Sequence, residues 1–301
     1  ELSGLLWTPN GPGPFPALLM RQPYGARIAS TVVYAHPSWY AQQGYVVLVL
    51  DVRGRGDSGG EFSGFASEAT DGDDALAWLK AHPLCNGRVG SYGFSYQGLT
   101  QLLGTDTNLQ PDALAPAMCG LDERLHWASE GGAHWWVLSL SWGLQLAAES
   151  CRRRGDQHAW QAIKDCLASA QQSRHGLALL KQHDPNNPVL QWLQNDPSQA
   201  AEWACHQPNP ERLRRPMQLL EGWCDPYLRG GLDLWQQALK CGGSPELIIG
   251  PWSHLSWDRR VGTCDMGPEA CGRVDQWQLA FFDQHLRGQS RPEQPSCWAY
   301  D

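Results

Sequence analysis

Several features that would assign a protein to a common class are missing from this chain of 301 residues. Basic residues are too few for a nucleic-acid surface, because 23 Lys and Arg stand against 31 Asp and Glu and give a net charge of −8. The longest apolar runs are far shorter than the ~20 residues of a membrane span, and no basic start leads into an apolar stretch as in a signal peptide. We therefore expect a cytoplasmic globular protein without nucleic-acid or membrane partners, and its oligomeric state stays open.

Cysteine spacing also lacks a recognisable pattern, although the chain contains ten cysteines. There is no C-x-x-C pair and no Cys/His spacing typical of a zinc site, so we expect reduced thiols, no disulfide framework and no metal. Tryptophan, in contrast, is abundant, with 16 residues. Seven of them fall within residues 122–212. Because large aromatic side chains fill cores or ligand pockets, this segment is a candidate for a pocket wall.

Apolar runs and amphipathic segments alternate along the first third of the chain and again after residue 213. Strands are predicted for residues 16–20, 45–52, 88–93, 113–118, 217–221 and 246–250. Helices are predicted for residues 38–43, 70–80, 96–103, 230–239 and 274–286. Strand signals vanish between residues 122 and 212, where helices are predicted for residues 137–153, 156–173 and 189–205, the last with an interruption near Pro197. We expect an α/β catalytic domain of residues 1–121 and 213–301 that carries an inserted helical cap of residues 122–212.

The most informative motif is Gly90-Ser-Tyr-Gly-Phe-Ser-Tyr-Gln-Gly98, in which a predicted strand breaks directly into a helix at Ser95. A nucleophile elbow needs this arrangement, because small residues permit the tight turn and the backbone N–H after the serine can donate to an oxyanion. Tyr96 would supply that N–H. The usual pattern is Gly-x-Ser-x-Gly, whereas here the glycine stands one position later, at Gly98. A glycine-rich turn without a catalytic role is the alternative interpretation.

A nucleophilic serine of this kind needs an acid and then a histidine further along the chain. Of the histidines that follow Ser95 outside the expected helical insertion, His285 falls within the last predicted helix, whereas His254 follows a predicted strand. Asp225 directly follows the strand before it. Both would sit with Ser95 at the carboxyl edge of the sheet. We predict that His254 is the general base and that Asp225 orients it, the alternative being a capping aspartate and a surface histidine.

A second oxyanion donor is expected in the loop after an earlier strand, where residues 20–25 read Met-Arg-Gln-Pro-Tyr-Gly. This loop has no glycine-rich oxyanion sequence. The phenol O–H of Tyr24 could replace a backbone N–H, since an oxyanion requires only a donor that is held in place beforehand. A packing role for Tyr24 is the alternative.

Residues 51–60 contain a formal Gly-x-Gly-x-x-Gly directly after a predicted strand. Dinucleotide binding requires these glycines to open a helix and an acid to end a second strand. Residues 61–69 resemble a loop instead, and the nearby acids Asp71, Asp73 and Asp74 stand at the start of a helix. The segment is therefore interpreted as a structural turn, and no cofactor is expected.

Seven blocks, taken in order, resemble the cocaine esterase and X-prolyl dipeptidyl-peptidase family of α/β-hydrolases, the CocE/NonD type. The blocks are residues 21–25; 51–54 with Gly56, Ser58 and Gly60; Asp71, Asp74 and Trp78; 93–98 with Gln101; 222–225; 250–254; and 281–288. The resemblance implies an α/β-hydrolase fold with a mostly parallel central sheet and an inserted helical cap. It accounts for the displaced Gly98, because this family writes its elbow as Gly-x-Ser-Tyr-x-Gly. It also implies that Tyr24 and the Tyr96 N–H form the oxyanion hole.

Within the expected cap, residues 127–133 and Trp142 resemble the stretch of cocaine esterases in which two tryptophans border the acyl pocket. Trp127 and Trp142 are therefore predicted to bind substrate, with core packing as the alternative. Members of the family usually continue into a C-terminal β-sandwich, which would begin where this sequence stops. The sequence also starts without Met, at a point where the family's first strands should be under way. We expect a fragment or a naturally short form with a more open pocket.

The predicted function is that of a serine hydrolase that cleaves carboxylic esters through an acyl-enzyme on Ser95, with a small-molecule substrate and no metal or cofactor. The nearest alternative is amide hydrolysis on the same three residues, by an aminoacyl or X-prolyl peptidase or a β-lactam acylase. This alternative needs an acidic site for the substrate ammonium, for which Glu123, Glu130 and Glu149 are candidates. A non-catalytic binding protein with a hydrolase fold is a further alternative, and the presence of a complete set of Ser, Asp and His argues against it.

Overall fold

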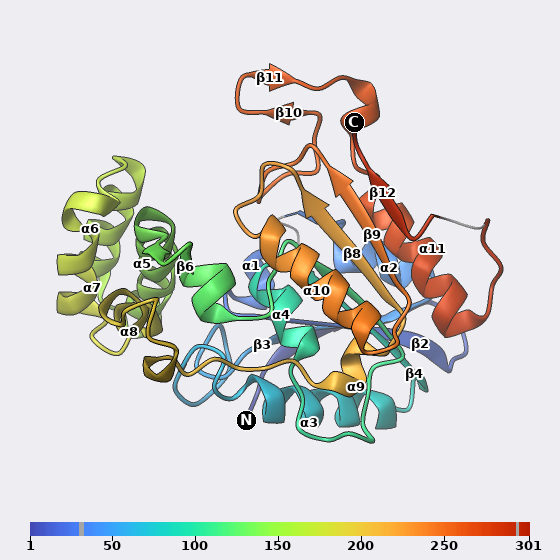
Figure 1. The fold of residues 1–301 in the computed structure, drawn as a ribbon. Helices are drawn as coiled ribbons and strands as arrows, with labels where there is room; N and C mark the ends of the chain where they lie inside the picture. Colours follow the sequence, from blue (N-terminus) through green and yellow to red (C-terminus); the bar gives the residue numbers. More distant parts are fainter. Residues whose placement is uncertain (30–32, 293–294) are drawn as a thin grey trace.

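The computed structural model describes residues 1–29, 33–292 and 295–301. Its centre is an eight-stranded sheet in the order β1-β3-β2-β4-β5-β8-β9-β12, in which β1 is antiparallel to β3 and the other neighbours are parallel (Figure 1). The strands are β1 (Gly4–Trp7), β2 (Phe15–Gln22), β3 (Val46–Asp51), β4 (Cys85–Phe94), β5 (Ala113–Ala117), β8 (Met217–Gly222), β9 (Pro245–Gly250) and β12 (Cys297–Ala299). The predicted, mostly parallel α/β sheet is confirmed.

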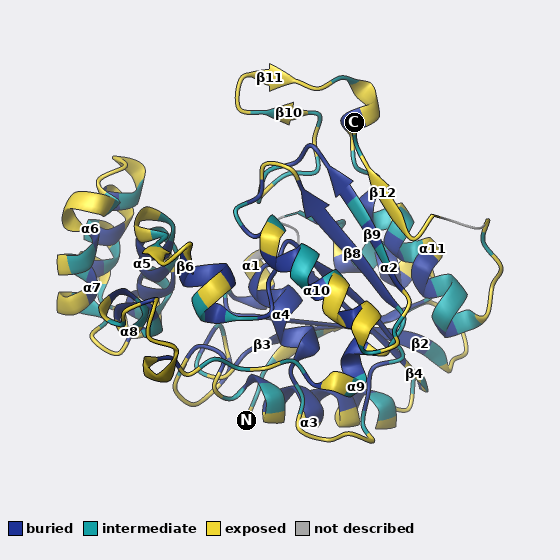
Figure 2. Cartoon of the chain, viewed as in Figure 1, coloured by how far each residue is buried: buried dark blue, intermediate teal, exposed yellow. Residues whose placement is uncertain are grey.

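Helices cover both faces of this sheet. They are α2 (Pro37–Gln42), α3 (Glu68–Ala81), α4 (Tyr96–Leu102), α10 (Leu228–Lys240) and α11 (Val274–Arg287). Because successive side chains of a strand point to opposite faces, Leu18 and Met20 of β2 pack on the side of α2 and α11, whereas Ala17 and Leu19 pack on the side of α3. Burial on both faces explains why these strands read as continuous apolar runs. The central strands are accordingly the most buried part of the chain (Figure 2).

Four helices lie beside the sheet and share a core of their own (Figure 1). They are α5 (Trp136–Arg153), α6 (Gln157–Ala168), α7 (Leu177–His183) and α8 (Pro188–Gln194). Two of the long helices predicted here are wrong in extent. The helix predicted for residues 156–173 ends at Ala168. The one predicted for residues 189–205 breaks before Pro197 as expected, because the residue before a proline is disfavoured in helical conformation, but it ends at Gln194 and no α-helix follows in the described chain up to residue 205.

Short elements complete the described chain. They are α1 (Ala26–Ala29), a π-helical segment (Glu123–Ala128), β6 (Ser129–Glu130), β7 (Ala133–His134), a second π-helical segment (Gln172–Gly176), a 3₁₀ turn (Ala200–Glu202), α9 (Pro210–Leu213), β10 (Arg260–Val261), β11 (Cys264–Asp265) and a second 3₁₀ turn (Pro268–Ala270). The helix predicted for residues 70–80 begins two residues earlier, at Glu68, and the Thr70 hydroxyl donates to the Ser67 carbonyl at 3.1 Å. In the described ranges no helix is both long and apolar enough to cross a bilayer. All ten cysteines are free thiols.

Candidate active site

Ser95 lies in a strained turn between β4 and α4. Its φ of 58° is in the left-handed region, which residues other than glycine adopt rarely and at a cost in energy. This conformation makes a tight turn, which brings the backbone of β4 and α4 close together and leaves room only for small residues at some positions near Ser95. A Cβ at Gly93 would come 2.4 Å from the Gln97 Cβ, and one at Gly98 would come 2.7 Å from the Cys119 Sγ. The displaced glycine of the motif thus has a steric reason, the close approach of α4 to the residues that follow β5.

Three side chains at the carboxyl ends of parallel strands form one hydrogen-bond series. The Oγ of Ser95 lies 3.0 Å from Nε2 of His254, and Nδ1 of that histidine lies 2.6 Å from Oδ2 of Asp225. The other carboxylate oxygen of Asp225 accepts the Tyr227 N–H at 2.6 Å. The Asp225 side chain is fully buried, so bulk water does not compete for the imidazole. The structure therefore brings together the three residues selected from the sequence, whereas His285 belongs to α11.

The loops that carry Asp225 and His254 are tied to each other through their backbones. The Cys224 N–H donates to the Trp252 carbonyl at 3.0 Å. Trp252 is itself almost completely buried, and its indole N–H donates to the Ala270 carbonyl at 2.7 Å. The buried Trp252 thus anchors the loop of His254 beside that of Asp225, and a preorganised site requires such a fixed separation of acid and base.

A pocket of about 470 Å³ opens beside Ser95 and His254. It is lined by Tyr24, Ile28, Phe94, Ser95, Gln97, Trp127, Leu138, Ser141, Trp142, Gln145, Tyr227, His254 and Leu255. Most of these side chains are aromatic or aliphatic, and none of the described residues in this set is an Asp, Glu, Lys or Arg. A lining of this kind favours a neutral, largely apolar ligand group.

Tyr24 and Trp142 meet in the wall of this pocket. The Trp142 indole N–H donates to the Tyr24 hydroxyl at 3.1 Å, which leaves the phenol proton available for another acceptor. Burial raises the pKa of Tyr24 to about 12, although the hydrogen bond from Trp142 and the charge of Arg55 oppose the rise. Tyr24 is therefore a neutral phenol over the physiological range and can act as a hydrogen-bond donor.

Trp127 reaches the same pocket from the π-helical segment. It is 3% exposed and stacks on Tyr227, with ring centroids 4.9 Å apart. Tyr227 in turn meets the imidazole of His254 edge-on at 4.9 Å. Trp127 and Trp142, the two tryptophans predicted from the sequence, lie 6.3 Å apart between ring centroids. Tyr227 was not predicted as a site residue, and its position two residues after Asp225 was the one signal that could have found it.

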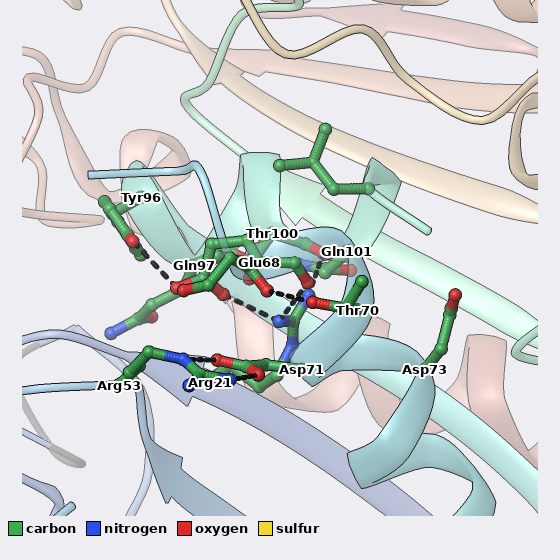
Figure 3. Close-up of polar contacts among 12 residues, drawn as sticks. Arg21, Arg53, Glu68, Thr70, Asp71, Asp73, Tyr96, Gln97, Thr100 and Gln101 are labelled. Atoms are coloured by element: carbon green, nitrogen blue, oxygen red, sulfur yellow. Dashed lines mark hydrogen bonds and ion pairs between the residues drawn. The ribbon is translucent and has the colours of Figure 1, made fainter. Parts of the chain in front are cut away.

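A buried polar network supports the start of α4 (Figure 3). Arg21, at the end of β2, donates to the Glu68 carboxylate at 2.6 Å and also to the Thr100 carbonyl. The other Glu68 oxygen accepts the Tyr96 hydroxyl at 2.9 Å. Arg21 and Glu68 are only 4% and 1% exposed, and such a buried pair needs every polar group satisfied. The network anchors the Tyr96 side chain and with it the backbone N–H that follows Ser95. Sequence reasoning missed Glu68, because an acid at a helix start is normally solvated.

The acids considered for a substrate ammonium stand in ion pairs and do not line the pocket. Their partners are His206 for Glu123 at 2.5 Å, Arg229 for Glu130 at 3.4 Å and Arg152 for Glu149 at 2.6 Å. In the part of the chain that the structure describes, none of the three therefore meets the requirement of the amide-cleaving alternative.

The glycine-rich segment 51–60 forms turns after β3, and the helix that follows begins only at Glu68. The acids of that helix have structural partners. Asp71 accepts the Arg53 Nε–H at 3.0 Å (Figure 3), and Asp73 pairs with Arg212 at 2.7 Å. Across the described residues, no group of three His, Cys, Asp or Glu is placed to hold a metal ion.

Residues 1–256 match the sequence model of the family described as X-Pro dipeptidyl-peptidase (S15 family). The chain is 28% identical over 302 residues to a cocaine esterase from Rhodococcus sp. (strain MB1 Bresler), an alignment that covers 95% of the chain and 52% of the esterase. A putative serine esterase from Mycobacterium bovis is 32% identical over 109 residues, which is 35% of the chain and 17% of that protein. The chain thus spans about half the length of the cocaine esterase.

Solved structures show the same architecture. A CocE/NonD family hydrolase from Staphylococcus aureus superposes with a TM-score of 0.66 at 19% identity, covering 99% of this chain and 50% of that one. An aminopeptidase from a Thaumarchaeota archaeon gives 0.64 at 20% identity, with 100% and 55% covered. At these identities the similarity shows the fold alone, and it confirms the α/β-hydrolase fold predicted from the sequence.

Proposed function

The chain belongs to the X-Pro dipeptidyl-peptidase family (S15 family), and on this premise we propose that it is a serine hydrolase that cleaves carboxylic esters. The acyl-enzyme forms on Ser95, with His254 and Asp225 as the other members of a catalytic triad. One observation carries the proposal: the unbroken hydrogen-bond series from the Ser95 Oγ through His254 to Asp225, at 3.0 and 2.6 Å, in the wall of a pocket. A nucleophile, a base and an orienting acid in this order are the parts of a serine hydrolase site.

The three side chains act at different points of this reaction. The Ser95 Oγ adds to the ester carbonyl carbon while Nε2 of His254 takes the hydroxyl proton. Asp225 accepts the Nδ1–H, which keeps Nε2 as the acceptor and stabilises the imidazolium. The imidazolium then protonates the departing alcohol, and the acyl group stays on Ser95. A water molecule, deprotonated by the same Nε2, then adds to the acyl carbon. The bond from this carbon to the Ser95 Oγ breaks, the imidazolium returns its proton to that oxygen, and the carboxylic acid is released.

Negative charge builds up on the former carbonyl oxygen in both steps. The proposed donors to this oxyanion are the Tyr24 hydroxyl and the Tyr96 N–H. The neutral state of Tyr24 and its unused phenol proton support the first donor. The anchoring of the Tyr96 side chain by Glu68 supports the second, because a donor held in place beforehand loses no energy to reorganisation.

The pocket favours an ester with a neutral, aromatic or apolar acyl group. Trp127, Trp142 and Phe94 supply aromatic surface on which such a group can pack. An aminoacyl or X-prolyl substrate would bring an ammonium group, which needs a carboxylate partner to leave water. The described lining offers none. Amide hydrolysis on the same triad is therefore the second candidate, and a non-catalytic binding protein is the third.

We also propose that residues 122–212 act as the cap of a catalytic domain formed by residues 1–121 and 213–301. Two observations support this division. Helices α5 to α8 have a hydrophobic core of their own, which includes Leu144 and Ile163. The same segment contributes part of the pocket wall, including Trp142.

A fluorophosphonate probe tests the nucleophile directly. Wild-type protein should be labelled and Ser95→Ala should not, because the probe bonds covalently to an activated serine. Equal labelling of both proteins would refute the assignment of Ser95. A parallel screen of p-nitrophenyl benzoate, p-nitrophenyl acetate and prolyl p-nitroanilides separates ester from amide cleavage. Faster turnover of the prolyl anilides than of the esters would replace the esterase proposal by the peptidase alternative.

A further inference from the structure

Arg55 is a buried arginine in the turn that follows β3, and it is 1% exposed. Its Nε donates to the Pro23 carbonyl at 2.8 Å, and its Nη1 donates to the Leu146 carbonyl at 3.0 Å and to the Ser150 hydroxyl at 3.1 Å. Its Nη2 has no hydrogen-bond partner in the described chain. The guanidinium carbon lies 5.1 Å from the centre of the Phe62 ring. All its hydrogen-bond acceptors are therefore neutral.

The other two buried arginines are arranged differently. Arg21 bonds to the Glu68 carboxylate at 2.6 Å, and Arg212 bonds to that of Asp73 at 2.7 Å. A buried cation without a carboxylate partner lowers stability, because it has lost its hydration without gaining a counter-ion. Burial lowers the pKa of Arg55, although the charges of Glu149 and Asp184, which form no ion pair with it, oppose the fall. The guanidinium still stays protonated, since arginine does not lose its charge in proteins.

The position of Arg55 connects it to the proposed oxyanion donor. Pro23 directly precedes Tyr24, and Leu146 lies one helical turn after Trp142 on α5. One guanidinium is thus hydrogen-bonded to the two segments that present the Tyr24–Trp142 pair. Its charge also acts on the phenol, because it lowers the Tyr24 pKa that burial raises.

We propose that Arg55 is a positioning residue for Tyr24, which holds the phenol against Trp142 and, through its positive charge, strengthens the phenol as a hydrogen-bond donor to the forming oxyanion. The proposal rests on the proposed hydrolase function. When the Ser95 Oγ bonds to the carbonyl carbon, the π electron pair of the carbonyl moves onto its oxygen, and the Tyr24 O–H donates to that oxygen. A stronger donor gains more from a negatively charged acceptor than from the neutral carbonyl of the bound ester. Through Tyr24, Arg55 therefore stabilises the transition state more than the ground state.

A double-mutant cycle with Tyr24→Phe tests this role. Arg55→Met removes the charge but keeps an unbranched side chain, and it should lower kcat for p-nitrophenyl esters about tenfold while KM changes less than about twofold. In the Tyr24→Phe background the same substitution should change kcat by less than about twofold, since the phenol through which Arg55 acts is gone. If the fold-loss of kcat in the double mutant equalled the product of the two single-mutant losses, the proposal would be overturned.

Arg153, at the end of α5, provides a matched control. Its exposed guanidinium donates to the Gly56 carbonyl and, at 2.9 Å, to the Ser58 carbonyl, so it also ties α5 to the turn after β3. Arg153→Met should leave kcat within about twofold of wild type in both backgrounds. If Arg153→Met and Arg55→Met lowered kcat equally, Arg55 would only be fastening α5, and the proposal would fail.

Thermal melting shows whether each variant is folded. Arg55→Lys is a second variant for the case that Arg55→Met does not fold. It keeps the charge and should keep kcat within about threefold of wild type, whereas a folded Arg55→Lys protein as slow as Arg55→Met would overturn the role of the charge. Fluorophosphonate labelling distinguishes this failure from that of the proposed function. Ester hydrolysis that survives in Ser95→Ala refutes the proposed function. In a second case, the wild type hydrolyses esters in a Ser95-dependent way, but the effects of the Arg55 and Tyr24 substitutions are independent. This result refutes only the role of Arg55 and leaves the proposed function standing.

Discussion

Replacing Asp225 by asparagine is expected to reverse the hydrogen bond that orients His254. The carboxylate now accepts the Tyr227 N–H with one oxygen and the His254 Nδ1–H with the other, each at 2.6 Å. In Asp225→Asn the amide oxygen would keep the Tyr227 N–H, so the amide NH₂ would face Nδ1. An NH₂ group can only donate, and Nδ1 must then be the acceptor and Nε2 must carry the proton. His254 could no longer take a proton from Ser95.

The size of the effect follows from this tautomer argument. A base held in the wrong tautomer lowers kcat by about 10⁴-fold in a serine protease triad, which corresponds to about 5 kcal/mol. Because asparagine has nearly the shape of aspartate and retains the bond to Tyr227, folding should be preserved. We therefore expect a loss of kcat of about this size, with KM changed far less and with a melting temperature within a few degrees of wild type.

Steady-state hydrolysis of p-nitrophenyl esters measures this loss, and the rate of fluorophosphonate labelling of Ser95 checks it independently. Asp233→Asn is the matched control. Asp233 contacts the buried His126 at 2.9 Å, so the same change is made in another acid–histidine pair, outside the pocket. Its kcat should stay within about threefold of wild type, since no proton moves through that pair. A folded Asp225→Asn protein within tenfold of wild-type kcat would refute the assignment of Asp225.

Three further outcomes are expected from the same site and its surroundings. Tyr24→Phe should lower kcat by about 10²- to 10³-fold with little change in KM, because it removes one oxyanion donor; an unchanged kcat would return Tyr24 to a packing role. Trp142→Phe keeps an aromatic wall but removes the 3.1 Å bond to the Tyr24 hydroxyl, so kcat should fall about five- to tenfold, and a change confined to KM would contradict this. The hydrogen bond to Glu123 raises the pKa of His206, so its contribution to stability is complete below the unfolded pKa of about 6.5 and is lost as pH rises through the higher folded pKa. The melting temperature of His206→Gln should therefore fall less between pH 6 and pH 9 than that of wild type. An equal fall in both proteins would show that His206 does not contribute to this pH dependence.

Much of the site could be predicted because its main residues sit where single strands end. Ser95, Asp225 and His254 each follow an apolar strand, and parallel strands deliver such residues to one edge of the sheet. Tyr24 was found in the same way, in the loop after β2. For these residues local pattern and topology together are sufficient, because the distances between their side chains are set by the spacing of the strands that carry them.

The supporting residues could not be predicted in this way. Glu68 accepts a hydrogen bond from the hydroxyl of Tyr96, which lies 28 residues later in the chain. Arg55 donates a hydrogen bond to the carbonyl of Leu146, which lies 91 residues later. Nothing near Glu68 or Arg55 in the sequence separates a buried charge from an ordinary solvated one. Their environment is created only when a loop or helix from elsewhere in the chain packs against them.

The sequence by itself determined the parallel sheet, the turn at Ser95 and the chain order of the proposed nucleophile, acid and base, since each depends on local periodicity or on a few adjacent residues. Only the tertiary structure decided which groups share the low-dielectric interior. It gave the pocket a lining without carboxylates in its described part, directed the Trp142 indole to Tyr24, and left the buried Arg55 with neutral hydrogen-bond acceptors. The physical reason is that burial and electrostatic pairing depend on contacts between segments far apart in the chain, and these contacts leave no mark on any one segment.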